Sequence, residues 1–264
     1  MQNFEFIAPS DTAAELRRLR QSNPLIHCIT NEVVQEITAN VLLAAGASPA
    51  MVVAEEEAGD FASVASALLI NLGTPYGERL NAMHIAVHGA TDADRPWVLD
   101  PVAAGGLPWR NEIIQEFVSM RPTVIRGNAS EILYLAGIGH GGKGVDSTDS
   151  SDSAVPAAVS LAKSSGSVVV VTGAKDYITD GKRIVCAEGG DPIITKVVGT
   201  GCSLSALMAA FVAGAEDTVR ACAACCAFVN RAGETAAAAS HGPGSFHNAY
   251  LDALYLLQPE DFEN

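Results

Sequence analysis

The sequence predicts an α/β protein, in which a mostly parallel central sheet is covered by helices on both faces. Short apolar runs alternate with amphipathic stretches of helical period, and repeated strand–helix–strand units with right-handed crossovers build parallel sheets. The run Val168–Val171 is apolar at every position, which is typical of a strand buried on both faces. No linker or internal repeat divides the chain, and we therefore expect a single domain over residues 1–264.

Polar residues and glycines follow the carboxyl ends of most expected strands. In chain order, the strands are expected at Leu25–Ile29, Ala50–Val53, Leu68–Asn71, Trp97–Leu99, Val124–Arg126, Val168–Thr172 and Ile193–Val198. The segment Tyr177–Val185 is interpreted as a hairpin. Its two-residue turn is expected at Asp180-Gly181, because this dipeptide favours tight hairpin turns.

The expected helices carry apolar residues at a spacing of three to four positions. They cover residues 11–21, 33–45, 57–67, 76–88, 110–119, 129–136, 154–164, 203–213, 217–239 and 246–257. The dipeptides His241-Gly242 and Pro243-Gly244 separate the last two helices.

The polar segment Gly139–Asp152 is expected to be a mobile surface loop. Within it, Gly139–Gly144 matches the dinucleotide-binding pattern G-x-G-x-x-G, and Gly137–Lys143 matches the start of a phosphate-binding P-loop. Both follow a helical stretch instead of a strand, and a glycine follows Lys143 where the P-loop requires Ser or Thr. We therefore accept neither motif, although the position of the segment would allow a lid over a nucleotide.

The charge balance excludes several classes of partner. The chain has 30 acidic and 16 basic residues and a net charge of −14, whereas nucleic acids and anionic membranes attract basic surfaces. No stretch approaches the roughly 18–20 uninterrupted apolar residues of a membrane helix. The N-terminus also lacks the basic region and apolar core of a signal peptide. We expect a cytoplasmic protein whose ligands are small molecules.

Six scattered cysteines do not indicate a disulfide framework or a metal site. Cys222, Cys225 and Cys226 share one face of an alanine-rich helical run, and no further Cys or His ligand lies nearby in the sequence. We interpret them as buried thiols that pack as small apolar groups.

The segment Val197–Phe211 carries the most informative functional pattern. A β-branched run ends at Gly199-Thr200-Gly201, and an apolar run of helical period follows at once. Glycines let the backbone approach a bound group, and the free N–H groups of a first helical turn attract anions such as phosphate. Cys202 stands at that helix start, where the helix dipole would stabilise a thiolate. The alternative interpretation is a tight strand-to-helix turn with a small buried thiol.

Charged residues follow two neighbouring strands at the edge where ligands bind in parallel sheets. Asn128 and Glu131 have the spacing of a helix capping box, yet the same acid could hold Mg²⁺ through water, with Arg126 beside it for phosphate. Asp100 offers a second carboxylate from another strand end. Two acids, an arginine and a glycine-rich anion site together indicate phosphoryl transfer.

Several segments, taken together, resemble the hydroxyethylthiazole kinases, a thiamin-salvage family of the ribokinase-like superfamily. The segments that carry the resemblance are Pro24–Asn31, Gly46–Met51, Leu99–Val102, Arg126–Glu131, Val171–Gly173 and Val198–Cys202. The resemblance runs almost end to end and implies a ribokinase-like fold. It also implies ATP-dependent phosphorylation of the hydroxyl of 4-methyl-5-(2-hydroxyethyl)thiazole, a requirement for Mg²⁺, and a homotrimer with active sites at subunit contacts.

The resemblance also implies roles for individual residues. Asn31 and the backbone of Met51 would hold the thiazole together with Gly199, and Arg126 and Thr172 would contact ATP. Asp100 and Glu131 would organise Mg²⁺. The residues implied in catalysis are Gly199, Thr200 and Gly201, which would cradle the transferring phosphoryl group, and Cys202, which stands where most ribokinase-like enzymes carry an aspartate base.

Two alternatives remain at this stage. A nucleotide-dependent hydrate dehydratase of the same fold would carry aspartate at the position of Cys202. A non-catalytic nucleotide-binding regulator would not need Asp100, Glu131 and the glycine turn together. Release of ADP that depends on the thiazole alcohol would separate both from a kinase.

Overall fold

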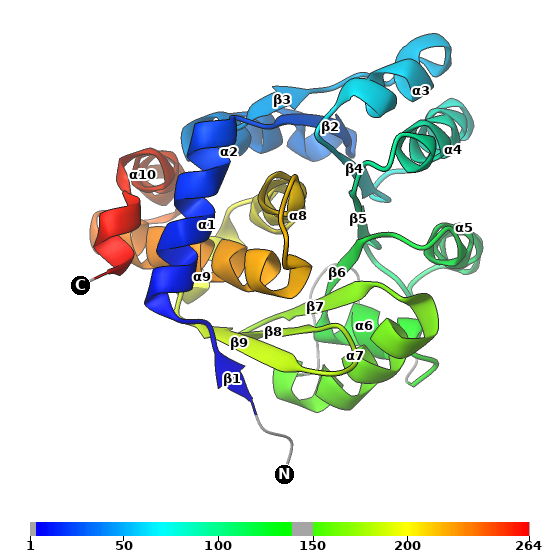
Figure 1. Ribbon diagram of the computed structural model, residues 1–264. Coiled ribbons are helices and arrows are strands. Elements are labelled where there is room, and N and C mark those ends of the chain that lie inside the picture. The colour runs from blue at the N-terminus through cyan, green and yellow to red at the C-terminus, as the bar shows by residue number, and fades with distance from the viewer. Residues whose placement is uncertain (1–3, 139–149, 264) are drawn as a thin grey trace.

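The centre of the molecule is one twisted sheet. The computed structural model describes residues 4–138 and 150–263, within which nine strands join in the order β1-β9-β8-β7-β6-β5-β4-β2-β3 (Figure 1). Every neighbouring pair from β3 to β7 is parallel, whereas β8 is antiparallel to both of its neighbours. The strands are β1 (Glu5–Phe6), β2 (Leu25–Ile29), β3 (Ser48–Ala50), β4 (Ala67–Asn71), β5 (Trp97–Asp100), β6 (Val124–Asn128), β7 (Val168–Thr172), β8 (Lys175–Thr179) and β9 (Ile184–Glu188). The predicted, mostly parallel sheet is confirmed.

Helices cover both faces of this sheet, as Figure 1 shows. One face carries α1 (Pro9–Ser22), α2 (Gln35–Ala45), α8 (Thr200–Val212), α9 (Thr218–Ala238) and α10 (Pro243–Leu256). The other face carries α3 (Glu55–Val64), α4 (Gly77–Asp92), α5 (Pro108–Ser119), α6 (Ala129–Leu135) and α7 (Ser151–Ser165). None of the helices in the described residues is both long and apolar enough to cross a membrane.

Two apolar cores form because side chains of a strand point alternately to opposite faces. In β7, Val168 and Val170 join the core under α8 and α9, while Val169 and Val171 join the core under the α3–α7 layer. All four are buried, which explains why this strand is apolar throughout.

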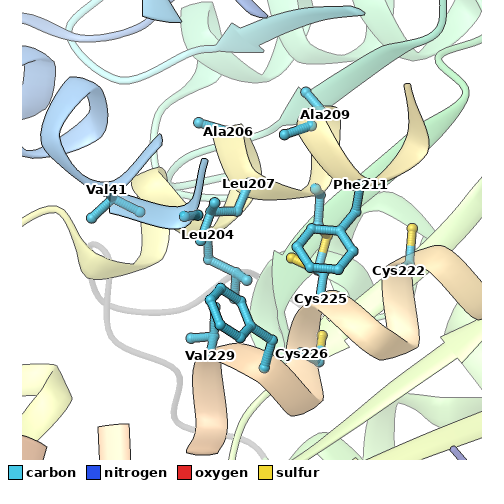
Figure 2. Close-up of a cluster of buried hydrophobic side chains, with 14 of the residues drawn as sticks. Val41, Leu204, Ala206, Leu207, Ala209, Phe211, Cys222, Cys225, Cys226 and Val229 are labelled. Carbon is cyan, nitrogen blue, oxygen red and sulfur yellow. The ribbon is translucent and has the colours of Figure 1, made fainter. Parts of the chain in front are cut away.

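Helix α8 is buried on nearly all sides and is held by α9. Figure 2 shows Leu204, Leu207 and Phe211 of α8 packed toward α9, where the side chains of Cys222, Cys225 and Cys226 lie. These three thiols are fully buried, which confirms their prediction as apolar packing groups. The packing fixes where the first turn of α8 points.

The expected strand at Ile193–Val198 is wrong, because Pro192–Lys196 forms a 3₁₀-helix, η2. The side chain of Asp191 accepts a hydrogen bond from the Ile193 N–H at 2.9 Å, and Pro192 occupies the first turn, where its missing N–H costs nothing. An Asp-Pro start therefore outweighs the β-branched composition. The glycine turn consequently follows a 3₁₀-helix, and α8 starts at Thr200 instead of residue 203.

The other departures are shifts of boundary, a longer hairpin connection and one missed strand. The expected strand Ala50–Val53 lies at Ser48–Ala50, and α4 extends to Asp92 instead of residue 88. The hairpin of β8 and β9 is confirmed, but Thr179 pairs with Ile184, so four residues form the connection instead of the two-residue turn expected at Asp180-Gly181. The two-residue strand β1 was not predicted, since Glu5–Phe6 is too short for a periodic pattern.

The expected loop Gly139–Asp152 lies mostly outside the described residues, as do the two motifs that were not accepted there. Its last part is a helix start, because Ser150 caps α7 and accepts a hydrogen bond from the Ser153 N–H at 3.3 Å.

Candidate active site

The carboxyl ends of neighbouring parallel strands bring the predicted polar residues to one edge of the sheet. Asn71 at the end of β4 pairs in register with Asp100 at the end of β5, and Asn128 of β6 pairs with Thr172 of β7. The first turn of α8 reaches the same edge, because Arg126 of β6 donates a hydrogen bond to the Gly201 carbonyl. In open parallel sheets, this edge is where ligands bind.

Arg126 joins three of the predicted elements. Its guanidinium donates hydrogen bonds to Thr172 Oγ1 at 2.6 Å and to the Gly201 carbonyl at 3.1 Å, and Nη1 lies 3.9 Å from Asp100 Oδ2. Its side chain is 13% exposed, so the charge remains within reach of solvent and of a ligand. A cation is thereby placed between the carboxylate and the glycine turn of α8.

Asp100 and Glu131 form a pair of buried acids. Asp100 Oδ2 accepts hydrogen bonds from Asn71 Nδ2 at 2.9 Å and from Ser205 Oγ at 2.8 Å. Burial raises the pKa of Asp100, against the opposing effect of the Arg126 charge. Burial and the nearby charge of Asp100 raise the pKa of Glu131 to about 7. A cation bound between the two carboxylates would stabilise the charged form of each.

The capping interpretation of Glu131 is also correct. Its Oε2 accepts from the Asn128 N–H at 2.8 Å, while Asn128 Oδ1 accepts from the Glu131 N–H at 3.0 Å, which completes a capping box at the start of α6. Its Oε1 accepts from the Ala103 N–H at 2.9 Å. Both oxygens are thus already bonded to backbone.

This donor set fits a magnesium ion that keeps most of its water. Residues 4–138 and 150–263 contain no group of three or more His, Cys, Asp or Glu side chains placed to hold a metal directly. Mg²⁺ usually retains several waters and binds through one or two carboxylates and the phosphates of a substrate. Two buried acids with raised pKa values, Asp100 and Glu131, satisfy that requirement.

The glycine turn has the geometry of an anion site. Gly199 has φ +86°, and a Cβ there would lie 2.5 Å from Ile37 Cγ2, so no other residue fits. No side chain caps α8, which leaves its first amides free of intrahelical partners. The hydroxyl of Thr200 donates to the carbonyls of Ile194 and Val197, at 3.0 and 3.2 Å, so the backbone N–H of Thr200 is its remaining donor for an anion.

Cys202 lies beside Asn31, with its Sγ 3.6 Å from Asn31 Nδ2. Burial and the charge of Asp100 raise the pKa of Cys202 to about 11, although Asn71, Arg126 and Asn31 oppose that rise, and this favours the buried thiol over the thiolate. The cost of burial outweighs the helix dipole that the sequence suggested. Cys202 is therefore a neutral thiol near pH 7.

Asn31 and Met51, two of the residues assigned to the thiazole, follow different strands at this edge of the sheet. Asn31 is buried in the loop after β2, and its Nδ2 donates to Asn71 Oδ1 at 3.0 Å. Met51 follows β3 at the same edge and is half-buried. His27 Nε2 lies 2.7 Å from the Val52 carbonyl, which holds the backbone next to Met51. No hydrogen bond within the described residues joins Met51 to Asn31.

Two polar residues of the site were missed from the sequence. Asn71 is the last residue of a predicted strand and ends on the ligand-binding edge, a signal that could have identified it. Ser205 lies three residues after Cys202 and so points to a neighbouring part of the same helix face. Its bond to Asp100 depends on how α8 lies against the sheet, which no local pattern reveals.

Comparison with known proteins gives one consistent result. Residues 16–260 match the model of the hydroxyethylthiazole kinase family. Hydroxyethylthiazole kinase of Escherichia coli O1:K1 / APEC is 53% identical over 256 residues, which cover 97% of this chain and 98% of that protein. A solved hydroxyethylthiazole kinase protein from Pyrococcus horikoshii OT3 is 36% identical with a TM-score of 0.86, over 94% of this chain and 93% of that one. A ribokinase-like superfamily protein from Enterococcus faecalis V583 has a TM-score of 0.69 at 13% identity, with 96% of each chain covered, and shares the fold alone.

Proposed function

The chain belongs to the hydroxyethylthiazole kinase family and has its ribokinase-like fold, and from this premise we propose how its residues transfer a phosphoryl group. It phosphorylates the hydroxyl of 4-methyl-5-(2-hydroxyethyl)thiazole for thiamin biosynthesis. As a kinase, it uses ATP as co-substrate. The observation that carries the proposal is Arg126, whose guanidinium bonds to both Thr172 and Gly201 and lies 3.9 Å from Asp100. Phosphoryl transfer needs a cation, an acid site for a metal and an anion-binding turn at one place.

In this proposal, Arg126 and Thr172 contact the phosphates of ATP. The backbone amides of Gly199, Thr200 and Gly201 receive the transferring phosphoryl group at the positive end of α8. These donors are held in place before the reaction, so they stabilise developing charge without reorganising.

Asp100 and Glu131 would hold Mg²⁺ at this edge of the sheet. When bound, Mg²⁺ neutralises charge on the phosphoryl oxygens. Asp100 keeps one oxygen turned to Asn71 and Ser205, and both oxygens of Glu131 accept backbone N–H bonds, so the two acids cannot swing away from the site.

The thiazole alcohol lies on the side of Asn31, the backbone of Met51 and Gly199. Val33 and Val198 adjoin this side in the sequence and are 63% and 65% exposed. Gly199 itself lies against Ile37 and Val34. An apolar ring with a polar hydroxyl suits apolar walls beside an amide side chain.

Cys202 acts next to the acceptor hydroxyl as a neutral thiol and not as a thiolate base. Its raised pKa leaves little thiolate near pH 7. The loose transition state of phosphoryl transfer asks little of a base, so the alcohol proton leaves late, to solvent. Positioning and charge neutralisation then supply most of the rate.

We extend the proposal to the assembly and its surroundings. The protein acts in the cytoplasm as a homotrimer with its active sites at subunit contacts, and it binds neither nucleic acid nor membrane. The net charge of −14 supports the last point, since those partners attract basic surfaces. Membership in the kinase family, together with cysteine at position 202, leaves no observation that favours a hydrate dehydratase or a regulator.

The test measures ADP release by a coupled assay and identifies the product by phosphorus NMR. We expect ADP release only when ATP, Mg²⁺ and the thiazole alcohol are all present, with a phosphate monoester as product. Chelation of the metal should abolish the signal, and added Mg²⁺ should restore it. Absence of the monoester at saturating substrate concentrations would refute the kinase assignment.

A further inference from the structure

A chain of side-chain hydrogen bonds links the acceptor side of the site to its acid side. Asn71 Oδ1 accepts from Asn31 Nδ2 at 3.0 Å, and Asn71 Nδ2 donates to Asp100 Oδ2 at 2.9 Å. Asn31 lies beside Cys202, whereas Asp100 lies beside Arg126. Asn71 is thus the one described side chain that bonds to both.

The direction of every bond in this chain is fixed by partners that cannot reverse. The Gly73 N–H donates to Asn71 Oδ1 at 3.0 Å, which identifies that atom as the oxygen. The Val33 N–H donates to Asn31 Oδ1 at 3.1 Å in the same way. The amide of Asn71 therefore donates toward Asp100, and the amide of Asn31 donates toward Asn71 and Cys202.

The surroundings leave this chain of hydrogen bonds no room to relax. Asn71 is 0% exposed and Asn31 is 5% exposed. A Cβ at Gly73 would lie 2.7 Å from Asn31 Nδ2, so glycine is needed there for close approach. Buried amides in fixed contact transmit a displacement of one to the next, since each lost bond leaves an unsatisfied polar group.

We propose that Asn71 is a positioning residue, which holds Asn31 and Asp100 in fixed mutual placement so that the acceptor hydroxyl and the ATP phosphates meet in line. The inference rests on the proposed roles of Asn31 and Asp100. Asn71 itself does not touch the reacting atoms. It acts on the alcohol only through Asn31 and on the phosphates only through Asp100.

The test compares Asn71→Leu with Ser205→Ala. Leucine has a similar volume but neither donor nor acceptor, while Ser205→Ala removes the other donor to the same Asp100 oxygen and leaves Asn31 untouched. The dissociation constant of the thiazole alcohol is measured by calorimetry without ATP or metal, and kcat is measured separately. We expect Asn71→Leu to weaken alcohol binding about tenfold and lower kcat about a hundredfold. Ser205→Ala should lower kcat by a smaller factor and leave alcohol binding unchanged.

A double-mutant cycle with Asn31→Ala separates positioning from general damage. The double variant Asn31→Ala/Asn71→Leu should bind the alcohol no more weakly than Asn31→Ala alone, because Asn71 acts on the alcohol through Asn31. Thermal melts accompany every variant, and Asn71→Ser, whose hydroxyl is too short to bridge the two partners, replaces Asn71→Leu if the latter does not fold.

Three outcomes overturn the inference: additive losses in the cycle, unchanged alcohol binding in folded Asn71→Leu, or unchanged binding in Asn31→Ala. These outcomes differ from a failure of the proposed function. In that case, the wild type itself neither binds the alcohol nor forms its phosphate ester.

Discussion

At the residue scale, the surroundings of a side chain decide its chemistry more than its place in a motif. Cys202 stands at a helix N-terminus, which favours a thiolate, yet burial beside Asp100 raises its pKa to about 11. Glu131 completes a capping box, yet its own burial and the charge of Asp100 raise its pKa to about 7. Both groups combine a structural and an electrostatic property that must be tested separately.

The pH dependence of alkylation tests the state of Cys202. A raised pKa means that the thiol is protonated at pH 7 and that the reactive thiolate fraction grows as pH rises toward about 11. We expect the rate of iodoacetamide modification of Cys202 in the ligand-free protein, measured by peptide mass spectrometry, to rise steadily from about pH 7 to about pH 10. A reference peptide with an exposed cysteine, added to the same tube, should level off near its ordinary pKa of about 8.5. A plateau for Cys202 below that of the peptide would contradict the raised pKa.

Substitution of Cys202 tests whether it acts as a base. Cys202→Ala should slow turnover by less than the roughly 10²–10⁴-fold that loss of a general base costs. Cys202→Asp should match or exceed the wild type, because a carboxylate at this place accepts a proton at least as well. Intact-protein mass spectrometry with ATP alone should show an unchanged mass. If both variants are inactive, or if a phosphorylated enzyme passes its phosphate to the alcohol, the mechanism is different.

Substitution of the two acids separates metal binding from capping. Asp100→Asn can still accept from Asn71 and Ser205, and Glu131→Gln loses one backbone bond at most. We expect turnover to fall by about 10²-fold or more in each variant. The free energy of unfolding, measured by thermal melts, should change by about 1 kcal/mol or less. Near-normal turnover in both variants would leave only the capping role.

At the element scale, helix packing and site geometry are separable. The helices α3 and α4 meet where Gly89 faces Gly59, and a Cβ at Gly89 would lie 2.3 Å from the Gly59 carbonyl oxygen. This crossing lies on the face opposite α8. By contrast, α8 delivers the glycine turn to the site because its other sides are packed against α9 and the sheet (Figure 2).

Two substitutions in α4 test this separation. Gly89→Ala should destabilise the protein by about 1–3 kcal/mol, since the backbone of α3 must move aside. Gly77→Ala, at the start of the same helix, meets no atom within 4 Å and should leave the melting temperature unchanged or slightly higher. Below their melting temperatures, both variants should keep wild-type kcat. A large loss of kcat in Gly89→Ala would show that the α3–α4 layer shapes the site.

At the scale of the whole molecule, one sheet serves two apolar cores and one ligand edge. All the proposed site residues lie at that edge, and the two cores hold the sheet and α8 in place beneath them. The expectation of one domain over residues 1–264 stays a prediction. So does the trimer, whose interface would complete each site.

Mass and activity measured at the same concentrations test the trimer. We expect sedimentation to give three times the 27.3 kDa of one chain, and specific activity to fall on dilution wherever the mass falls toward that of one chain. The single-chain mass of a dilute sample provides the internal reference. A fully active single chain would refute sites that depend on subunit contacts.

The sequence by itself determined the order of most strands and helices, the glycine turn at Gly199 and the edge at which Arg126, Asp100 and Thr172 meet. These follow from local properties: the period of apolar residues, the φ that only glycine adopts readily, and the shared direction of parallel strands. Tertiary structure alone decided that burial raises the pKa of Cys202 and that Asn71 and Ser205 converge on Asp100. Burial and side-chain contact depend on how segments distant in the chain pack, because desolvation and hydrogen bonding act through space and leave no periodic trace in the sequence.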